Sequence, residues 1–325
     1  MMSSYVWLFA MLSTVADEPA ARTSSFVEQA RQACEPSQIS RTVDRVSVEP
    51  LNSATGDLAG FIVRDEQSGA WMAVFYDEAS QATAARYAPC FGAQLRLLHQ
   101  KTADTRDNAR WASVVFTRDA AYVPPRDGSD TRWTIQTRAD GALDAEGLTR
   151  LVVTIPHEQV HAFQRRAGAI TPRWFHEGHA EWVGRQVTQH ISPFHADRHA
   201  ADAHNALTAA SAAVDLDRWG GVAVKREAML RQLSPADRRR AETDPSFVPA
   251  GPFSFGPDDL ESDEANAPAR YQAAWQVFEL IAERSGDAPV RDWVRVMTEV
   301  PGRVGTIQLE ETAVSNLGTA LPNRP

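Results

Sequence analysis

The stretch TIPHEQVHAFQ, residues 154–164, contains the string HEQVH, in which two histidines lie four positions apart. In an α-helix, residues i and i+4 share one face, so His157 and His161 can direct ring nitrogens at a single metal ion. Glu158 lies about 100° around the helix from His157, where its carboxylate can reach a water on that ion without being a ligand. The competing interpretation of this string alone is two histidines on a solvated helix.

The residues just before the string conflict with a regular helix. Val152–Ile155 is a β-branched run and Pro156 follows it. Proline is tolerated in the first turn of a helix but kinks a helix interior. We therefore expect either a kinked helix or a new helix that begins near Pro156, with HEQVH helical in both cases.

A second segment, PRWFHEGHAEW at residues 172–182, follows closely and predicts another amphipathic helix, over 172–189. Glu177 would complete a His-His-Glu ligand set, and Glu181, one turn later, would accept the free N–H of one of the histidines. The small Gly178 lets this helix approach another one closely. A solvated acidic face is the alternative interpretation of the two glutamates.

Two histidines beside Glu177 compete as the third ligand. His176 and His179 lie about 100° before and 200° after Glu177 on a helical wheel, so neither shares its face. We expect His179 to face solvent or another partner, and His176 remains a minor alternative that would line the pocket.

HEQVH followed by WFHEGHAEW resembles the gluzincin metallopeptidases, which include thermolysin and the zinc aminopeptidases, and is similar to secreted bacterial peptidase-like proteins with HExxH and WxxEGxAE motifs. The resemblance covers about 30 residues strongly and about 130 loosely. It implies a zincin-like fold, one Zn²⁺ ion on His157, His161 and Glu177, and Glu181 behind them. The chain departs from the group in its shorter spacing from His161 to Glu177 and in lacking a GxMEN-like exopeptidase motif. Ala167 stands where a metzincin would carry its third histidine.

Two further groups of residues have alternative interpretations. Tyr271 is similarly placed to a tyrosine that opens a helix behind the zinc helices in related proteins, and would donate to the oxyanion. With Trp275 and Phe278 it equally fits a plain core stripe at i, i+4 and i+7. Histidines also cluster in QHISPFHADRHAADAH, where a second metal site competes with solvated polar surface or the lip of a cleft: His190, His195, His199 and His204.

Outside the motifs, the pattern predicts an α+β protein, with a mixed-sheet subdomain before a mainly helical one and the active-site cleft between them. Apolar and β-branched runs predict strands at 41–48, 58–65, 70–76, 113–118 and 132–138. Helices are expected at 23–35, at 78–100 with a break near Pro89, and at 269–285. Residues 233–269 are interpreted as loop, and the last twenty residues show no clear pattern. The expected organisation is a signal peptide (1–21), an α+β region (22–140), a zincin catalytic region (141–310) and a C-terminal tail (311–325).

Composition restricts the environment and the partners. The net charge of −9 argues against a nucleic-acid binder, because neutralising phosphates needs clustered Lys and Arg. The apolar run from Tyr5 to Val15 has the length of a signal-peptide core and is too short to span a membrane, which predicts cleavage after Ala16 and a periplasmic or secreted protein. Its n-region has no Lys or Arg, so a buried first helix or a retained anchor is the alternative. Cys34 and Cys90 could pair after export.

The sequence therefore predicts an exported zinc metallopeptidase, most simply an endopeptidase acting on a peptide or protein substrate, with Glu158 as general base and Tyr271 as oxyanion donor. The strand at 132–138 would offer an edge for an extended peptide. Two alternatives stand beside this function. One is a non-catalytic zinc-binding module that keeps the ligands, and the other is a zinc hydrolase that acts on cell-wall peptide.

Overall fold

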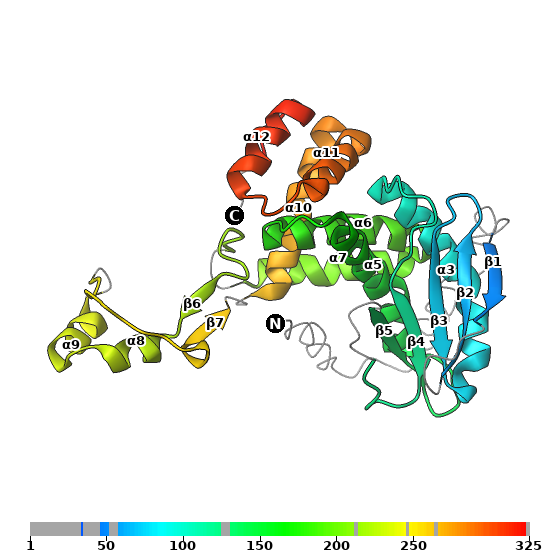
Figure 1. Cartoon of the computed structure of the whole chain (residues 1–325), viewed down its shortest axis with the longest axis horizontal. Coiled ribbons are helices and arrows are strands. Elements are labelled where there is room, and N and C mark those ends of the chain that lie inside the picture. The colour runs from blue at the N-terminus through cyan, green and yellow to red at the C-terminus, as the bar shows by residue number, and fades with distance from the viewer. Residues whose placement is uncertain are drawn as a thin grey trace. The chain divides into compact units, whose positions relative to one another are not determined.

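The computed structural model describes Cys34 and residues 46–51, 58–124, 131–210, 214–244, 247–262 and 266–322. It combines a five-stranded mixed sheet with many helices, so the predicted α+β class is confirmed (Figure 1). The chain divides into two compact units. Unit 1 comprises residues 1–163 and 183–200, and unit 2 comprises residues 164–182 and 201–325.

The sheet of unit 1 follows the order of the sequence, β1-β2-β3-β4-β5. Its strands are β1 (Val46–Pro50), β2 (Ala59–Asp65), β3 (Trp71–Tyr76), β4 (Ser113–Thr117) and β5 (Arg132–Gln136). Strand β2 pairs antiparallel with both β1 and β3, whereas β4 pairs parallel with both β3 and β5. The four strands predicted from 58 to 138 are confirmed within two residues. Among the described residues, β5 pairs only with β4 and is therefore an edge strand.

Helix α3 (Gln81–Thr102) connects β3 to β4 and packs along the sheet (Figure 1). Phe91 of α3 meets Phe116 of β4 edge-on, with ring centroids 6.0 Å apart. The predicted break near Pro89 is wrong, because α3 continues through this residue. Pro89 leaves only the carbonyl of Ala85 without its helical donor, and Ala85 is exposed, so water can take that carbonyl while the buried face holds the helix together.

The metal-motif helices follow the sheet. Helix α4 (Ala145–Thr149) leads into a π-helical turn, η2 (Arg150–Thr154), and α5 (Ile155–Ala167) begins directly after it. The expectation of a helix that starts near Pro156 is thus confirmed. Helix α6 (Arg173–Ile191) carries the second motif, and α7 (Pro193–Thr208) follows.

Unit 2 is mainly helical. After α7 come β6 (Val222–Val224), α8 (Arg226–Gln232), α9 (Pro235–Thr243), a 3-10 turn η3 (Pro257–Asp259), β7 (Leu260–Ser262), α10 (Ala267–Ser285), α11 (Asp287–Glu299) and α12 (Thr306–Leu317). Strand β6 pairs with β7 in an antiparallel ribbon. The expectation of loop at 233–269 is wrong, because this segment contains α9 and β7. The last twenty residues, which show no clear pattern in the sequence, contain all of α12.

The core of unit 2 is aromatic and surrounds Phe278 of α10. Rings from α6 and α11 lie with their centroids 5.5–6.5 Å from that of Phe278: Trp174, Phe175, Trp182 and Trp293. Gly178 lets α6 reach this ring, since a Cβ built there would lie 2.8 Å from the Ala274 carbonyl oxygen and 2.9 Å from two Phe278 ring carbons. The expected close approach at Gly178 is therefore confirmed, and α10 is the helix it meets.

A methyl group at Gly178 has no room, so Gly178→Ala should lower the free energy of unfolding by about 1–3 kcal/mol, the usual cost of overpacking. Urea titration followed by tryptophan fluorescence measures this change. Gly305→Ser is the matched control, because a Cβ at Gly305 meets open space and serine is a good residue at the N-cap of α12. Equal stability of the Gly178→Ala variant and the wild type would contradict the packing described here.

Cys34 and Cys90 form a disulfide, with their Cα atoms 5.2 Å apart. The Cys34 N–H also donates to the Ile191 carbonyl, 3.1 Å away, at the end of α6. The expected signal peptide at 1–21 lies outside the described residues, as does the helix expected at 23–35 apart from Cys34. None of the described helices is both long enough and apolar enough to cross a membrane.

Candidate metal centre

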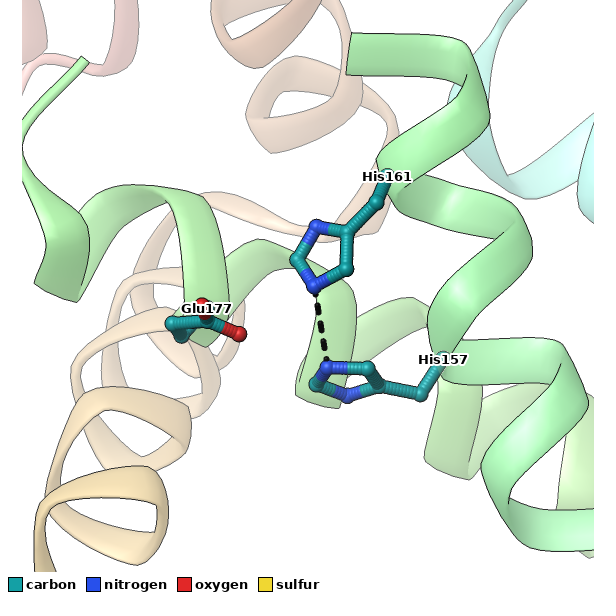
Figure 2. A group of neighbouring side chains, drawn as sticks. All are labelled: His157, His161 and Glu177. Atoms are coloured by element: carbon teal, nitrogen blue, oxygen red, sulfur yellow. Dashed lines mark hydrogen bonds between the residues drawn. The ribbon is translucent and has the colours of Figure 1, made fainter. Parts of the chain in front are cut away.

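His157 and His161 on α5 lie beside Glu177 on α6 (Figure 2). One possible ligand atom from each residue lies within 4.8 Å of those from the other two. All three side chains are buried, with Glu177 only 2% exposed. These are the three ligands predicted from the sequence, and in the described part of the chain no other group of three such side chains gathers in this way.

The two imidazoles have a geometry that suits a shared ion. Their Nε2 atoms face each other 3.1 Å apart, and the ring planes are nearly perpendicular at 83°. Two ligands placed 2.0–2.1 Å from a tetrahedral zinc are separated by about 3.3–3.4 Å, so a shift of a few tenths of an ångström would seat both nitrogens. Two imidazoles and one carboxylate also form a donor set typical of catalytic zinc sites with an open fourth position. The residues present therefore fit a zinc ion.

Glu177 has a cationic neighbour one turn earlier on the same helix. The Nε of Arg173 lies 3.8 Å from Glu177 Oε1, and His176 Nδ1 lies 3.9 Å from the same oxygen. A buried carboxylate is costly unless it is paired or bound to a metal, and Arg173 supplies part of that compensation. His176 therefore lies next to the ligand group, and Glu177 is the residue of this helix that joins the two α5 histidines.

His179 lies in the protein interior, so of its two expected placements the solvent-facing one is wrong and the one against another partner holds. Its side chain is fully buried, its Nδ1 lies 3.1 Å from Gln164 Nε2, and its ring is 6.1 Å from that of Phe278. The same Gln164 amide donates to the His176 carbonyl at 2.8 Å. The aromatic core of unit 2 accounts for this placement, because it covers the side of α6 that the wheel assigned to solvent or a partner.

Gly184 is a residue that the sequence analysis missed. A Cβ at this position would lie 3.1 Å from both the backbone nitrogen and the Cα of His157, so α6 touches the main chain of α5 at the first ligand. Glu177, Glu181 and Gly184 have the spacing i, i+4 and i+7, which places them on one face of α6. That spacing is the pattern that could have identified Gly184. Glu181 is buried on this face, and its predicted hydrogen bond to a histidine stays a prediction.

Tyr271 is buried in unit 2, with its ring edge-on to Trp219 at 4.8 Å. Burial raises the pKa of its hydroxyl, and the negative charge of Glu177 raises it further, while Arg173 opposes the shift through its charge and a hydrogen bond. Tyr271 is thus a protonated donor close to the third ligand. Phe278, two turns along α10, belongs to the aromatic core, in agreement with the core stripe that the sequence offered as one alternative, whereas the role of Tyr271 as oxyanion donor stays a prediction.

Glu158 lies in the first turn of α5 and is half-buried. It is not one of the three grouped ligand residues, which agrees with a position beside the ion rather than on it. Its assignment as general base stays a prediction.

The four clustered histidines, one at the end of α6 and three in α7, differ in how deeply they are buried. His190 and His204 are exposed and His199 is half-buried, whereas His195 is only 2% exposed and its Nδ1 lies 2.7 Å from the Ser192 hydroxyl. No second group of three metal-ligand residues is found among the described residues, so the second metal site considered for this cluster gains no support.

His195 should make the stability of the protein depend on pH. Burial lowers its pKa to about 4, with a contribution from Arg198, whereas the unfolded value is 6.5. Because the folded value is the lower one, the stabilisation is complete above pH 6.5 and is lost as the pH falls toward 4, by up to about 3 kcal/mol. Urea unfolding at pH 7.5, 5.5 and 4.5 in the presence of a chelator measures this loss. His195→Leu should flatten the pH dependence, and an unchanged slope in that variant would contradict the assignment.

No protein-family model matches the chain, and no curated protein matches it either.

Proposed function

We propose that this protein is an exported zinc-dependent metallohydrolase with a zincin-like fold, acting as an endopeptidase. The observation that carries the proposal is the buried group of His157, His161 and Glu177, whose ligand atoms lie within 4.8 Å of one another. Two imidazoles and a carboxylate leave a fourth position open for water or substrate, and a purely structural site usually closes that position with a fourth protein ligand.

In the proposed reaction Glu158 transfers the proton and Tyr271 donates a hydrogen bond. When bound, zinc supplies an acidified water and polarises the scissile carbonyl. Glu158 takes the proton of the attacking water as the oxygen bonds to the amide carbon, and then delivers that proton to the nitrogen of the breaking C–N bond. Tyr271 keeps its proton, because burial and the nearby Glu177 raise its pKa, and it donates a hydrogen bond to the developing oxyanion.

The edge strand β5 suits an extended substrate. It pairs with β4 alone among the described residues, so its outer edge has main-chain groups facing away from the sheet. One of these, the Thr134 carbonyl, accepts a hydrogen bond from Arg150 at 3.0 Å. A peptide strand that adds to this edge would be bound largely through its backbone, with modest sequence preference.

The disulfide between Cys34 and Cys90 supports export, because such bonds persist in oxidising compartments and are rare in reducing ones. Under this proposal the protein is periplasmic or secreted, and the predicted cleavage after Ala16 would leave both cysteines in the mature chain.

Proteolysis by metal-free and reconstituted protein tests the function. We expect chelator-treated protein to be inactive on casein and on a peptide mixture, and one equivalent of zinc to restore cleavage. Cleavage of muropeptides alone would identify cell-wall peptide as the substrate and contradict the endopeptidase assignment. Stoichiometric zinc binding without cleavage of any of these would instead identify a non-catalytic zinc module.

A further inference from the structure

The carbonyl groups just before the metal motif have lost their usual donors. The π-helical turn η2 ends where the Ile155 N–H donates to the Arg150 carbonyl, five residues back. Pro156 comes next and has no N–H. It therefore cannot donate to Leu151 in the i+5 pattern of the π turn, nor to Val152 in the i+4 pattern of an α-helix.

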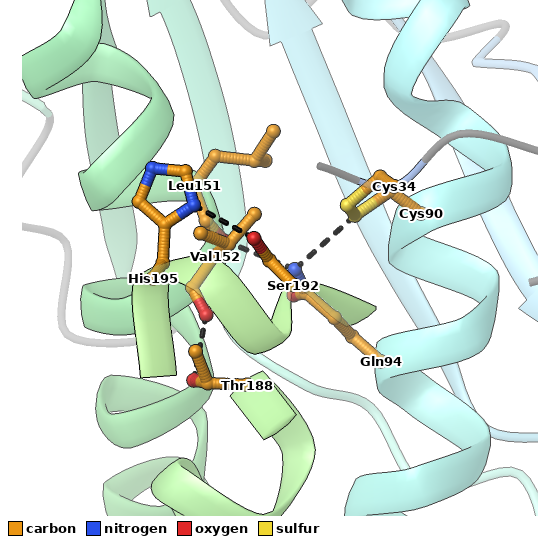
Figure 3. Close-up of a disulfide and its surroundings, with 8 residues drawn as sticks. All are labelled: Cys34, Cys90, Gln94, Leu151, Val152, Thr188, Ser192 and His195. Carbon is orange, nitrogen blue, oxygen red and sulfur yellow. Dashed lines mark hydrogen bonds between the residues drawn. A yellow bond between two sulfur atoms is a disulfide. The ribbon is translucent and has the colours of Figure 1, made fainter. Parts of the chain in front are cut away.

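Two side chains from distant parts of unit 1 meet these same two carbonyls (Figure 3). Gln94 of α3 donates its Nε2 hydrogen to the Leu151 carbonyl at 3.0 Å, and the Thr188 hydroxyl of α6 donates to the Val152 carbonyl at 2.7 Å. Both side chains are buried, at 0% and 1% exposure. The Oε1 of Gln94 is buried without a hydrogen-bond partner among the described residues. The amide N–H that donates to Leu151 is therefore the polar group of this side chain that forms a stabilising contact with the backbone.

The π turn decides which way the histidine face of α5 points. It adds one residue to the helical path, and each residue of an α-helix turns the chain by about 100°. Without that extra residue, the face that carries His157 and His161 would rotate by about this angle relative to α4. On the opposite side, Gly184 of α6 is packed against the His157 backbone and leaves little freedom for a different rotation.

We propose that Gln94 and Thr188 are positioning residues of the metal centre. They donate the hydrogen bonds that Pro156, without an N–H, cannot donate to the Leu151 and Val152 carbonyls. These bonds stabilise the π turn, and the π turn directs His157 and His161 toward the ion. This inference rests on the proposed zinc site and adds two residues from outside both motifs. Neither residue touches the ion or the substrate, and both act through the backbone of η2.

The test compares zinc affinities, measured by competition with a chromogenic chelator, in full-length disulfide-bonded protein. Thr188→Val removes the hydroxyl without changing the size of the side chain and should weaken zinc binding about tenfold or more, as loss of an outer hydrogen bond at a metal site typically does. Thr188→Ser keeps the hydroxyl and should stay within about twofold of the wild type.

Thr102→Val is the matched control. The Thr102 hydroxyl is also buried and bonds the carbonyl four residues back, at Leu98, as Thr188 does at Gly184. The two threonines differ because the single hydroxyl hydrogen of Thr188 is shared between the Gly184 carbonyl at 2.9 Å and the Val152 carbonyl at 2.7 Å. Thr102→Val should therefore leave zinc affinity unchanged even if it lowers stability, and an equal loss of affinity in both variants would overturn the proposal.

The Pro156→Ala background separates positioning from general packing. Alanine restores an N–H at residue 156 that can donate to Val152. Adding Thr188→Val to the Pro156→Ala variant should therefore weaken zinc binding by less than about threefold. An equal cost with and without Pro156 would overturn the proposal. If Thr188→Val does not fold, Gln94→Leu, which removes the donor to Leu151, takes its place in the comparison.

Zinc binding by the wild type and by Thr188→Val distinguishes the positioning role from the metal site itself. If wild-type protein binds no zinc, the metal site and the positioning role fall together. If the wild type binds zinc and Thr188→Val binds it equally well, the metal site stands and the positioning role alone is wrong.

Discussion

His161→Ala should remove zinc from the protein. His161 is 4% exposed, its Nε2 faces that of His157 at 3.1 Å, and it supplies one of the three grouped ligands. Sharing the 10–16 kcal/mol typical of a structural zinc over four coordination positions gives about 3 kcal/mol for each, a factor of roughly 100 or more in affinity. Metal analysis after dialysis against a weak chelator should find about one zinc per chain in the wild type and almost none in the variant.

His190→Ala is the control for this experiment. His190 lies near the end of α6; unlike His161 of α5, it is exposed and lies outside the ligand group. Its replacement should leave the zinc content at the wild-type value. Retention of zinc by His161→Ala, or its loss from His190→Ala, would place the metal elsewhere in the chain.

Glu158→Gln should reduce hydrolysis by about 10³-fold while zinc content and stability stay the same. The amide has the size of the carboxylate but cannot take a proton from water, and general acid–base catalysis typically contributes 10²–10⁴-fold. Because Glu158 is not one of the grouped ligands, its replacement should leave zinc affinity unchanged. The measurement is the rate of casein cleavage by both proteins at equal zinc loading.

Glu146→Gln is the control for the loss of one negative charge. Glu146 lies in the first turn of α4 and is exposed, as expected of an acid that only stabilises a helix start. It should retain full activity. Equal cleavage rates for Glu158→Gln and the wild type would remove the peptidase chemistry from this site and favour a binding module.

Local pattern was enough to predict the sheet and the two motif helices. Strands β2 to β5 are short β-branched and aromatic runs between turn residues, which directly indicate buried strands. The three ligand residues were identifiable because the spacing of each motif fixes a helix face. Helix α9, by contrast, buries no side chain and therefore has no hydrophobic period, and its remaining clues were local, in the N-cap Ser234 followed by Pro235.

Features that depend on tertiary contact could not be predicted in this way. Gln94 is 57 residues away from the carbonyl that it meets and Thr188 is 36 residues away, and neither carbonyl can take a hydrogen bond from Pro156, which has no N–H. The effect of a proline on a helix also could not be predicted from the sequence. Helix α3 continues through Pro89, whereas Pro156 follows a change from π-helix to α-helix. What differs is where the carbonyl without a donor lies, exposed in α3 and buried in η2.

X-ray absorption at the zinc edge of the reconstituted wild-type protein tests the central claim most directly, because it reports the ligand atoms themselves. The proposed site predicts a four-coordinate ion with two imidazole nitrogens at about 2.0–2.1 Å and oxygen donors at about 2.0–2.2 Å. Absence of bound zinc, a sulfur ligand at about 2.3 Å, or a shell without two imidazoles would contradict the assignment of His157, His161 and Glu177 as its ligands.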